Sequence, residues 1–232
     1  AADGLSLWLV ALTCVVGIVA LLAASREVDR RAGRFHALLL WALAGIVGVF
    51  VAVDLILFYF FWELMLVPTY YLYLWGHDRQ LRAALKFFIF TQLSGLLMLL
   101  AIVGLALSHA QATGVLSFDY LTLLADPPTG PLATWLFLGF WLAFAVKLPL
   151  LPFHSWQPDA YATAPTAVSI VLAGAMAKTA GYGLLRFAIP LFPEAAAGLA
   201  PYLLVLAALS ILYAAWTAFG QSDYKRLVAY SS

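Results

Sequence analysis

Charged residues are scarce in this chain. Only 10% of its 232 residues are Asp, Glu, Lys or Arg, whereas about one-quarter is usual for a soluble domain. So few charges cannot cover a globule of this size with a water-facing surface. This excludes a soluble enzyme, a nucleic-acid binder and a disordered protein. The 12 Lys and Arg nearly balance the 11 Asp and Glu, so we expect no polybasic patch for lipid or nucleic acid.

Residues that hold cofactors are also few. Cys14 is the single cysteine, which excludes an internal disulfide and an iron–sulfur cluster that needs about four ligands. The Gly181–Gly183 segment lacks the third glycine and the preceding strand of a dinucleotide-binding fingerprint. Of the four histidines only His154 lies well inside an apolar run, which argues against a bis-histidine haem. We interpret the other three as solvated surface residues near loops: His36, His77 and His109. We expect no metal or cofactor on this chain.

Hydrophobic residues, by contrast, make up 65% of the sequence, and they predict an all-α integral membrane protein. The apolar stretch at residues 37–75 must divide at Asp54, because one helix of that length would be about 58 Å long against a hydrocarbon core of about 30 Å. The runs do not alternate as barrel strands do. Seven spans are predicted, one of them discontinuous: Leu5–Ala24, His36–Ala52, Asp54–Trp75, Leu81–Ser108, Leu132–Tyr161, Thr166–Ala188 and Gly198–Phe219. The sizeable loop is His109–Gly130.

The loop charges support this count. If each run crosses once, most basic loop residues lie on one side of the membrane and the acidic ones on the other, with Arg186 near the acidic side. The positive-inside rule places the basic loops in the cytoplasm of a bacterium or the matrix of an organelle. We predict a bacterial plasma membrane. The two groups are Arg26, Arg30, Arg31, Arg34, Arg79, Arg82, Lys225 and Arg226 on one side, and Asp54, Asp119, Asp126 and Glu194 on the other.

Three charged residues fall near the middle of predicted helices: Glu63, Lys147 and Lys178. A mid-membrane charge costs at least about 2.5–3.5 kcal/mol on insertion scales. Burial lowers the pKa of a lysine and raises that of a carboxyl group, and a nearby opposite charge reverses both shifts. A lysine whose acidic partner moves away therefore releases its proton, and a row of such groups is typical of a proton relay. Lys86 is a further candidate, although five residues inside its helix it could extend to the surface.

A break is expected directly after Lys147. Pro149 and Pro152 each remove a backbone donor from the helix. Unpaired backbone at membrane depth is tolerated only inside protein or beside water, so we predict a hydrated pocket there. His154 follows the break and can carry a proton near neutral pH. The alternative is that the buried charges are structural ion pairs that fix helix register.

Several long motifs carry a family resemblance. They are Phe61–Pro68, Leu74–His77, Lys86–Gln92, Ala143–Pro149, Pro152–Ala160, Ala164–Ser169, Leu172–Gly174, Lys178–Phe187 and Gln221–Ser232. Together they resemble the M-type antiporter-like subunits of respiratory complex I, the NADH–quinone oxidoreductase; mitochondrial chain 4 is the equivalent there. The resemblance covers the chain from about its second predicted helix to the last residue.

The resemblance implies about fourteen helices built from two inverted five-helix repeats. Residues 1–35 are then the first transmembrane helix and basic loop. Residues 36–190 are the first repeat, with the broken helix at 132–161, and residues 191–232 begin a truncated second repeat. Both ends look cut, and the second repeat, where the proton exit of the family lies, is mostly missing.

The resemblance also implies the roles of the charged residues. Glu63 and Lys147 form a pair that opens and closes, Lys178 is the central relay lysine, and His154 is a link. FMN, iron–sulfur clusters, NADH and quinone are expected on other subunits. The implied partners are other membrane-arm subunits, including further antiporter-like ones, and the lipid bilayer.

We therefore predict a proton-translocating membrane-arm subunit of the NADH:quinone oxidoreductase, coupled to remote quinone reduction. A subunit of a related multisubunit cation/proton antiporter or membrane-bound hydrogenase is the first alternative, because these share the Glu/Lys/Lys arrangement. A non-conducting membrane scaffold is the second alternative. A direct quinone site is a third idea, for which no set of residues argues.

Overall fold

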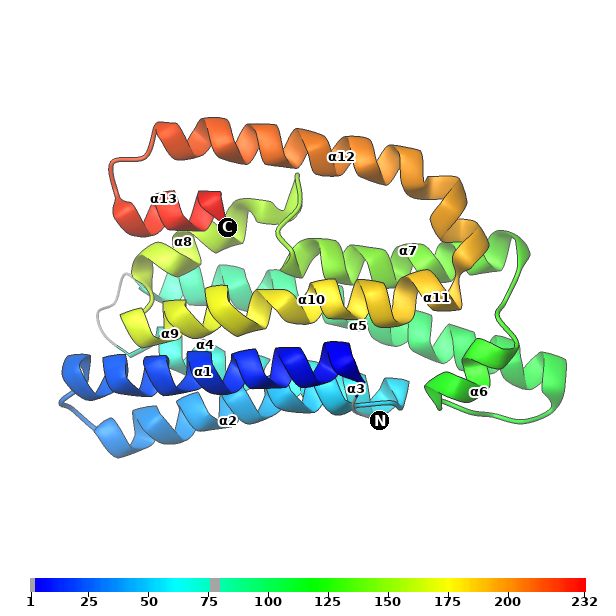
Figure 1. The fold of residues 1–232 in the computed structure, drawn as a ribbon, viewed down its shortest axis with the longest axis horizontal. Coiled ribbons are helices and arrows are strands. Elements are labelled where there is room, and N and C mark those ends of the chain that lie inside the picture. The colour runs from blue at the N-terminus through cyan, green and yellow to red at the C-terminus, as the bar shows by residue number, and fades with distance from the viewer. Residues whose placement is uncertain (1–2, 76–79) are drawn as a thin grey trace.

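The computed structural model describes residues 3–75 and 80–232 (Figure 1). Within these ranges the chain is helical with no named β-strand, and seven segments are long and apolar enough to cross a membrane. The predicted all-α membrane fold is confirmed. The segments are α1 (Gly4–Glu27), α2 (Ala32–Val51), α3 with α4 (Leu55–Leu64 and Leu66–Tyr73), α5 (Gln80–Thr113), α7 (Gly130–Lys147), α9 to α11 (Thr166–Leu191) and α12 (Pro193–Phe219).

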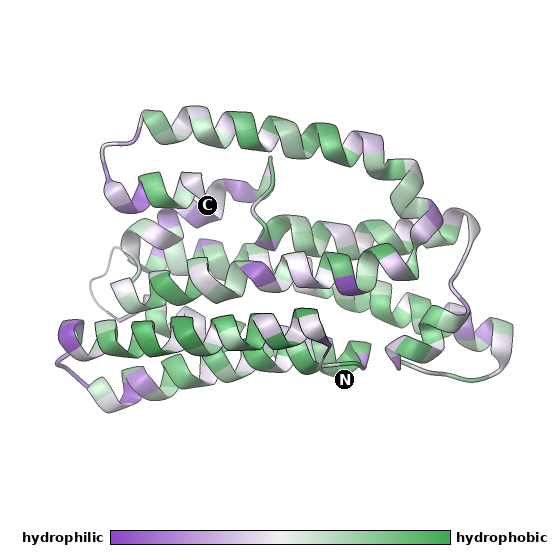
Figure 2. Ribbon diagram, in the orientation of Figure 1, coloured by the Kyte–Doolittle hydropathy of each residue, from purple (hydrophilic) through white to green (hydrophobic). Residues whose placement is uncertain are grey.

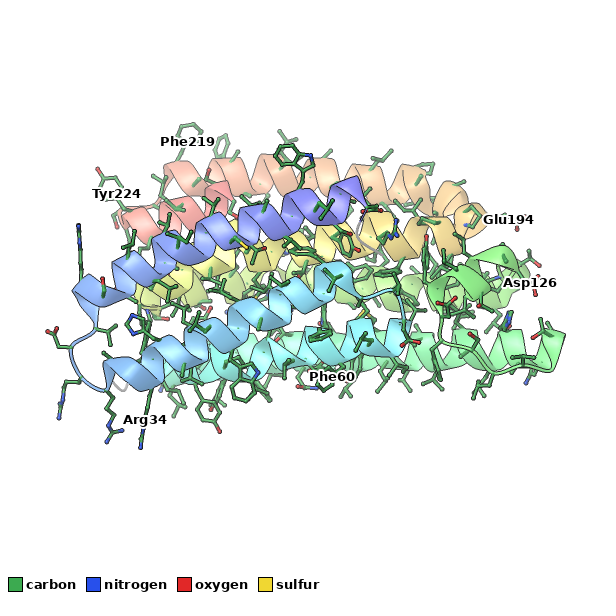
Figure 3. All side chains as sticks on the ribbon, turned by 60° about the horizontal axis from the view of Figure 1, so that its bottom comes forward. Arg34, Phe60, Asp126, Glu194, Phe219 and Tyr224 are labelled. Carbon is green, nitrogen blue, oxygen red and sulfur yellow. The ribbon has the colours of Figure 1, made fainter. Side chains whose placement is uncertain are left out.

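Polar and apolar residues are separated along the bundle. Hydrophilic residues gather at its two ends, and the helices between them are mostly apolar, with isolated hydrophilic residues such as those on α10 (Figure 2). Figure 3 places Arg34 and Tyr224 at one end and Asp126 and Glu194 at the other. This agrees with the predicted division of basic and acidic loops. Arg79 and His77 lie outside the described residues.

The predicted turn at Asp54 is present. Its carboxylate accepts the backbone N–H of Leu57 at 2.9 Å, which caps α3. The same turn pairs with the long loop, because Leu55 N–H donates to the Phe118 carbonyl at 2.9 Å and Tyr120 N–H donates to the Val53 carbonyl at 3.0 Å. The loop is therefore fixed against the start of α3.

That loop is shorter than predicted. α5 continues through His109 to Thr113 and stops at Gly114, whose φ of 78° is a left-handed conformation that favours glycine. His109 is buried at 8% exposure, so its interpretation as a solvated residue was wrong. The loop also holds a short helix, α6 (Tyr120–Ala125), because the Asp119 carboxylate accepts the N–H of Thr122 at 2.8 Å.

The span predicted as one helix from Asp54 to Trp75 is interrupted. α3 ends at Leu64, and α4 begins at Leu66. Pro68 explains the interruption, since it has no N–H to donate to the carbonyl of Leu64 four residues earlier. Glu63 therefore lies at the end of a helix, beside a kink.

The break after Lys147 is confirmed. α7 ends at that residue, a 3₁₀ turn η1 covers Phe153–Ser155, and α8 (Trp156–Thr163) resumes the path. Neighbours satisfy the freed backbone groups: the Trp156 indole donates to the Val146 carbonyl at 2.9 Å, and Leu151 N–H donates to the Ser210 hydroxyl of α12 at 3.0 Å. Buried protein contacts are the condition under which irregular backbone is tolerated at membrane depth.

The span from Thr166 to Leu191 contains two π-helical turns. η2 (Leu172–Met176) and η3 (Leu184–Ala188) lie on either side of α10 (Ala177–Gly183), between α9 (Thr166–Val171) and α11 (Ile189–Leu191). π-Helical turns inside helices are frequent at functional sites. After α12, the short helix α13 (Tyr224–Ser231) turns back and packs against α8 and α12 (Figure 1).

Candidate functional site

Lys147 is buried at the centre of the candidate site. It is 2% exposed and is the last residue of α7, which packs mainly against α5. Its ammonium nitrogen lies over the Trp62 ring, 4.0 Å from the ring centroid. A cation over a desolvated tryptophan face gains about 2 kcal/mol or more. In this arrangement the lysine charge is stabilised by an aromatic face.

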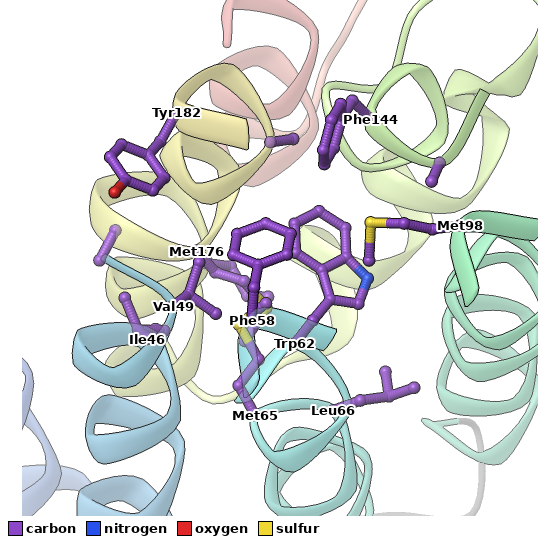
Figure 4. Close-up of a cluster of buried hydrophobic side chains, with 14 of the residues drawn as sticks. Ile46, Val49, Phe58, Trp62, Met65, Leu66, Met98, Phe144, Met176 and Tyr182 are labelled. Carbon is purple, nitrogen blue, oxygen red and sulfur yellow. The ribbon is translucent and has the colours of Figure 1, made fainter. Parts of the chain in front are cut away.

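Aromatic side chains hold Trp62 in place. Trp62 is 1% exposed and lies beside Phe58 and Phe144, with ring centroids 5.7 and 5.6 Å away. Figure 4 shows these three rings together in the buried cluster, near Met98. Each such aromatic contact adds about 0.5–1.5 kcal/mol beyond area burial. The packing fixes the ring that faces Lys147.

Glu63 follows Trp62 and is half-buried. Its Oε1 is fully enclosed and has no hydrogen-bond partner within the described part of the chain. Tyr59 and Gln92 are the neutral polar side chains that face the carboxyl group. Gly95 of α5 makes room for it, because a Cβ at that position would overlap Oε1. A carboxylate oxygen that is enclosed but has no hydrogen-bond partner can accept a bond from a mobile partner or from water.

Glu63 and Lys147 are close enough to interact electrostatically. Among the described residues, however, they form no direct ion pair. The sequence predicted contact either directly or through one water. The direct form is not adopted here, because the ammonium lies on the Trp62 ring instead, and the water-bridged form stays a prediction.

Lys178 lies apart from this pair. It is exposed on the surface of the chain, and its ammonium donates to the carbonyl of Ala173. Ala173 belongs to the π-helical turn η2, where the regular i to i+4 hydrogen-bond ladder is interrupted. The partner that Lys178 has in this structure therefore lies on its own helix.

His154 lies on the far side of the break, beside a cavity of about 640 Å³. The cavity begins at Leu148 and Pro149 and is lined by α12 and α13, as the predicted pocket beside the break requires. The His154 ring stands edge-on to Tyr213, with centroids 5.1 Å apart. Its Nδ1 is enclosed and has no hydrogen-bond partner among the described residues.

Lys86 belongs to a separate network at the basic end of the bundle. Its ammonium lies 2.8 Å from a carboxylate oxygen of Asp159 and donates to the Ser155 carbonyl at 2.6 Å. The other Asp159 oxygen lies 3.1 Å from the Arg226 guanidinium. One carboxylate of α8 thus connects α5 to α13. Lys86 is bound to α8 rather than extended freely to the surface.

Sequence reasoning missed Trp62, Gly95 and the Asp159 network. Trp62 precedes an intramembrane acid in the sequence. However, an aromatic residue within an apolar run looks the same whether it only packs in the core or also binds a cation. Asp159 and Arg226 are 67 residues apart in the chain, so only the fold brings them together. Within the described ranges, no three His, Cys, Asp or Glu gather where they could hold a metal ion.

A polytopic membrane bundle with two interrupted helices, a half-buried acid and a buried lysine is typical of the class of antiporter-like membrane proteins. The comparisons give the family. The model of the NADH:quinone oxidoreductase/Mrp antiporter transmembrane family matches residues 52–232. The chain belongs to this family.

Individual relatives agree with the family. NADH-quinone oxidoreductase subunit M of Pseudomonas aeruginosa is 55% identical over the whole chain, which covers 47% of that protein. A chain of respiratory complex I from Thermus thermophilus superimposes with a TM-score of 0.85 at 40% identity, over 98% of this chain and 47% of that one. A chain of an archaeal membrane-bound sulfane sulfur reductase gives 0.78 at 26% identity, over 97% and 38%. The chain spans about half the length of the curated relatives it matches.

Proposed function

We propose that this chain is part of a proton-translocating membrane-arm subunit of an NADH:quinone oxidoreductase, with no redox chemistry on the chain itself. The names of its relatives support the complex. One observation carries the mechanism: Lys147 is almost fully buried at a helix break, with an open carboxylate oxygen of Glu63 in the same cluster. A structural ion pair would be closed, because an unpaired buried charge is costly.

In the proposed mechanism, the distance between Glu63 and Lys147 controls a proton on the lysine Nζ. When the carboxylate approaches, its negative charge favours the protonated ammonium. When it withdraws, burial favours the neutral amine, and the proton passes through bound water to the next acceptor. Trp62 supplies a resting position for the ammonium while it is away from the carboxylate.

His154 and Lys178 extend the proposed relay. His154 lines the cavity that begins one residue after Lys147, and its enclosed Nδ1 has no hydrogen-bond partner among the described residues, which suits a proton acceptor near neutral pH. Lys178 lies at the surface of this chain, which fits a transfer to another protein segment. Lys86 forms an ion pair with Asp159 at the basic end of the bundle and supports the structure there instead of carrying the proton.

The remaining features of the proposal follow from the family. The partners are other membrane-arm subunits, including antiporter-like ones, and the redox cofactors and quinone are held elsewhere in the complex. The basic loops face the cytoplasm of a bacterial plasma membrane. Residues 1–35, 36–190 and 191–232 correspond to a leading helix, a first repeat and the start of a second.

The alternative assignment is a related ion-translocating complex, and one of the comparisons supports it. The likeness to the archaeal sulfur reductase fits a conserved membrane module coupled to a different electron-transfer partner. The proton mechanism would be retained and the donor and acceptor would change. Co-purification of the full-length protein with NADH-oxidising activity separates the two assignments.

Proton pumping by the full-length complex tests the proposed mechanism. In membrane vesicles, Lys147→Ala should lower proton uptake driven by NADH at least about tenfold, because a relay group is lost. Arg26→Ala, exposed in the last turn of α1 at the basic end, is the control and should retain pumping. Equal pumping by the Lys147→Ala complex and the control would refute the relay.

A further inference from the structure

Most of the surface of α12 is left uncovered by the rest of the described chain. Of its 27 residues, the buried ones are Ala195 and Ser210. Ala195 lies in the first turn, so Ser210, at 9% exposure, is the residue that the middle of the helix buries. A serine in an apolar span can bond its own helix, and at helix interfaces such residues also bond a neighbouring segment. The burial of Ser210 therefore directs attention to its partners.

The Ser210 hydroxyl makes two hydrogen bonds. It donates to the Leu206 carbonyl of its own helix at 2.8 Å and accepts the Leu151 N–H of the helix break at 3.0 Å. A hydroxyl has one proton and two lone pairs. The proton is therefore directed along α12, and a lone pair is directed at the break. Because the bond to Leu206 alone would satisfy a serine, the second bond serves the broken segment.

The neighbouring backbone groups at the break bond within their own span. Leu148 N–H donates to the Phe144 carbonyl at 2.7 Å, and Leu150 N–H donates to the Ala145 carbonyl at 2.9 Å. In this stretch of the described chain, the Leu151 N–H is the one that bonds a different span. A single hydrogen bond thus connects the backbone of the break to α12.

Tyr213 gives α12 a second contact with the same segment. It lies three residues after Ser210, which places the two side chains on one face of the helix, and both line the cavity beside the break. The Tyr213 ring is the one that stands edge-on to His154. Leu151 lies four residues after Lys147 and three before His154. The two contacts of α12 therefore hold the chain between the proposed relay groups and at the second of them.

We propose that Ser210 is a positioning residue for proton transfer across the break. Its hydroxyl, together with the Tyr213 ring, holds the broken segment so that Lys147 and His154 keep the spacing at which a proton passes between them. Ser210 takes no proton itself, because its own proton is engaged by the Leu206 carbonyl. This inference rests on the proposed function, since it concerns the transfer from Lys147 to the acceptor beyond the break.

The same contacts give α12 control over the break. A shift of α12 would displace the Leu151 N–H and the His154 ring together, and a displacement of about 1 Å can lower a rate about a hundredfold. In the proposed division of the chain, α12 belongs to the start of the second repeat. The position of that repeat would then reach the relay of the first repeat through Ser210 and Tyr213.

Removing the hydroxyl tests the positioning role. In vesicles containing the full-length complex, Ser210→Ala should lower NADH-driven proton uptake per assembled complex about fivefold, which corresponds to one hydrogen bond of about 1 kcal/mol. Ser210→Thr keeps the hydroxyl and should restore most of the uptake. Thr217→Ala is the matched control, because the Thr217 hydroxyl donates to the Tyr213 carbonyl on its own helix at 2.8 Å. Uptake by Ser210→Ala equal to the control would overturn the proposal.

The pH dependence of pumping separates positioning from a loss of stability. A less stable complex lowers uptake at every pH by the same factor once the amount of assembled complex is measured. A changed spacing between Lys147 and His154 alters the surroundings of two titrating groups, so the pH optimum of Ser210→Ala should shift. Ser210→Thr should return the optimum to its original value. A lowered uptake with an unchanged optimum would show that Ser210 is only structural.

Amide exchange tests the hydrogen bond without measuring pumping. Pro149 and Pro152 have no N–H, so the exchangeable amides between 148 and 152 belong to three leucines, two of which keep their bonds within the span. At constant pH, Ser210→Ala should accelerate exchange of one amide in this stretch, that of Leu151, about fivefold. Thr217→Ala should leave it unchanged. Unaltered exchange in Ser210→Ala would overturn the contact on which the proposal depends.

Failure of the proposed function would give a different result. If the Lys147→Ala complex pumps normally, the relay itself is wrong. If Ser210→Ala loses the protection of the Leu151 amide and still pumps normally, the relay stands and the positioning role of Ser210 is wrong.

Discussion

The Lys147 ammonium lies 4.0 Å from the centre of the Trp62 ring, and Trp62 immediately precedes Glu63. The buried lysine thus rests on an aromatic face next to its proposed acidic partner instead of in a closed ion pair. Glu63 and Lys147 each lie at the end of a helix. Helix α3 ends one residue after Glu63, and α7 ends at Lys147. Interrupted helices at both residues allow local movement that a continuous helix would resist.

The space beside Glu63 is the subject of the first prediction. In Gly95→Ala, the new Cβ overlaps Oε1 of Glu63, so the carboxylate must move without any change of charge. We expect proton pumping to fall about tenfold or more, since small displacements of reacting groups are costly. Gly198→Ala is the control, because a Cβ there meets nothing within 4 Å. Equal pumping in the two variants would contradict the role given to this space.

Lys178 gives the second prediction. Among the described residues, its ammonium donates to the carbonyl of Ala173 on its own helix, so Lys178→Ala should assemble and yet pump less. Lys178→Arg should also pump less, because a guanidinium keeps its proton. Pumping and coupled quinone reduction are measured in vesicles. Full pumping by the Arg variant together with failed assembly of the Ala variant would show a structural charge.

The Asp159 network gives the third prediction. Asp159→Asn leaves Lys86 and Arg226 facing each other without a carboxylate. We expect stability to fall by about 1 kcal/mol per lost pair, because these groups are partly solvated. Thermal unfolding of the purified complex measures this loss. The double variant Asp159→Asn with Lys86→Met should recover part of it, because one of the two unpaired cations is removed; unchanged stability in Asp159→Asn would mean that the pairs do not contribute.

The fourth prediction concerns pH. The N–H of Thr122 holds the pKa of Asp119 below its ordinary value. A lowered carboxyl pKa stabilises the fold above the unfolded value of about 3.9 and ceases to do so as the pH falls through the folded value. The protection of the α6 amides, measured relative to their intrinsic exchange rate at each pH, should therefore fall at acidic pH. Asp119→Asn still caps a helix but does not titrate, so its exchange should lack this step; the same step in both proteins would contradict the assignment.

The sequence predicted the membrane bundle and the break after Lys147 for physical reasons. A run of apolar residues long enough to cross the membrane is a local property, and so is the missing N–H of Pro149 and Pro152. The α3 break was predictable from Pro68 by the same rule, but it was not identified. The resting place of Lys147 on Trp62 depends on packing between α3 and α7, which local patterns do not encode.

A relay and a structural pair differ most directly in what happens when both partners are removed together. In vesicles containing the full-length complex, proton uptake per NADH oxidised is measured for Glu63→Gln, Lys147→Met and the double variant. A structural pair is often replaceable by uncharged residues, so its double variant should pump normally. Groups that act in one relay are not additive and cannot restore one another. We predict that the double variant pumps no better than the poorer single variant; recovery of full pumping would contradict the proton relay.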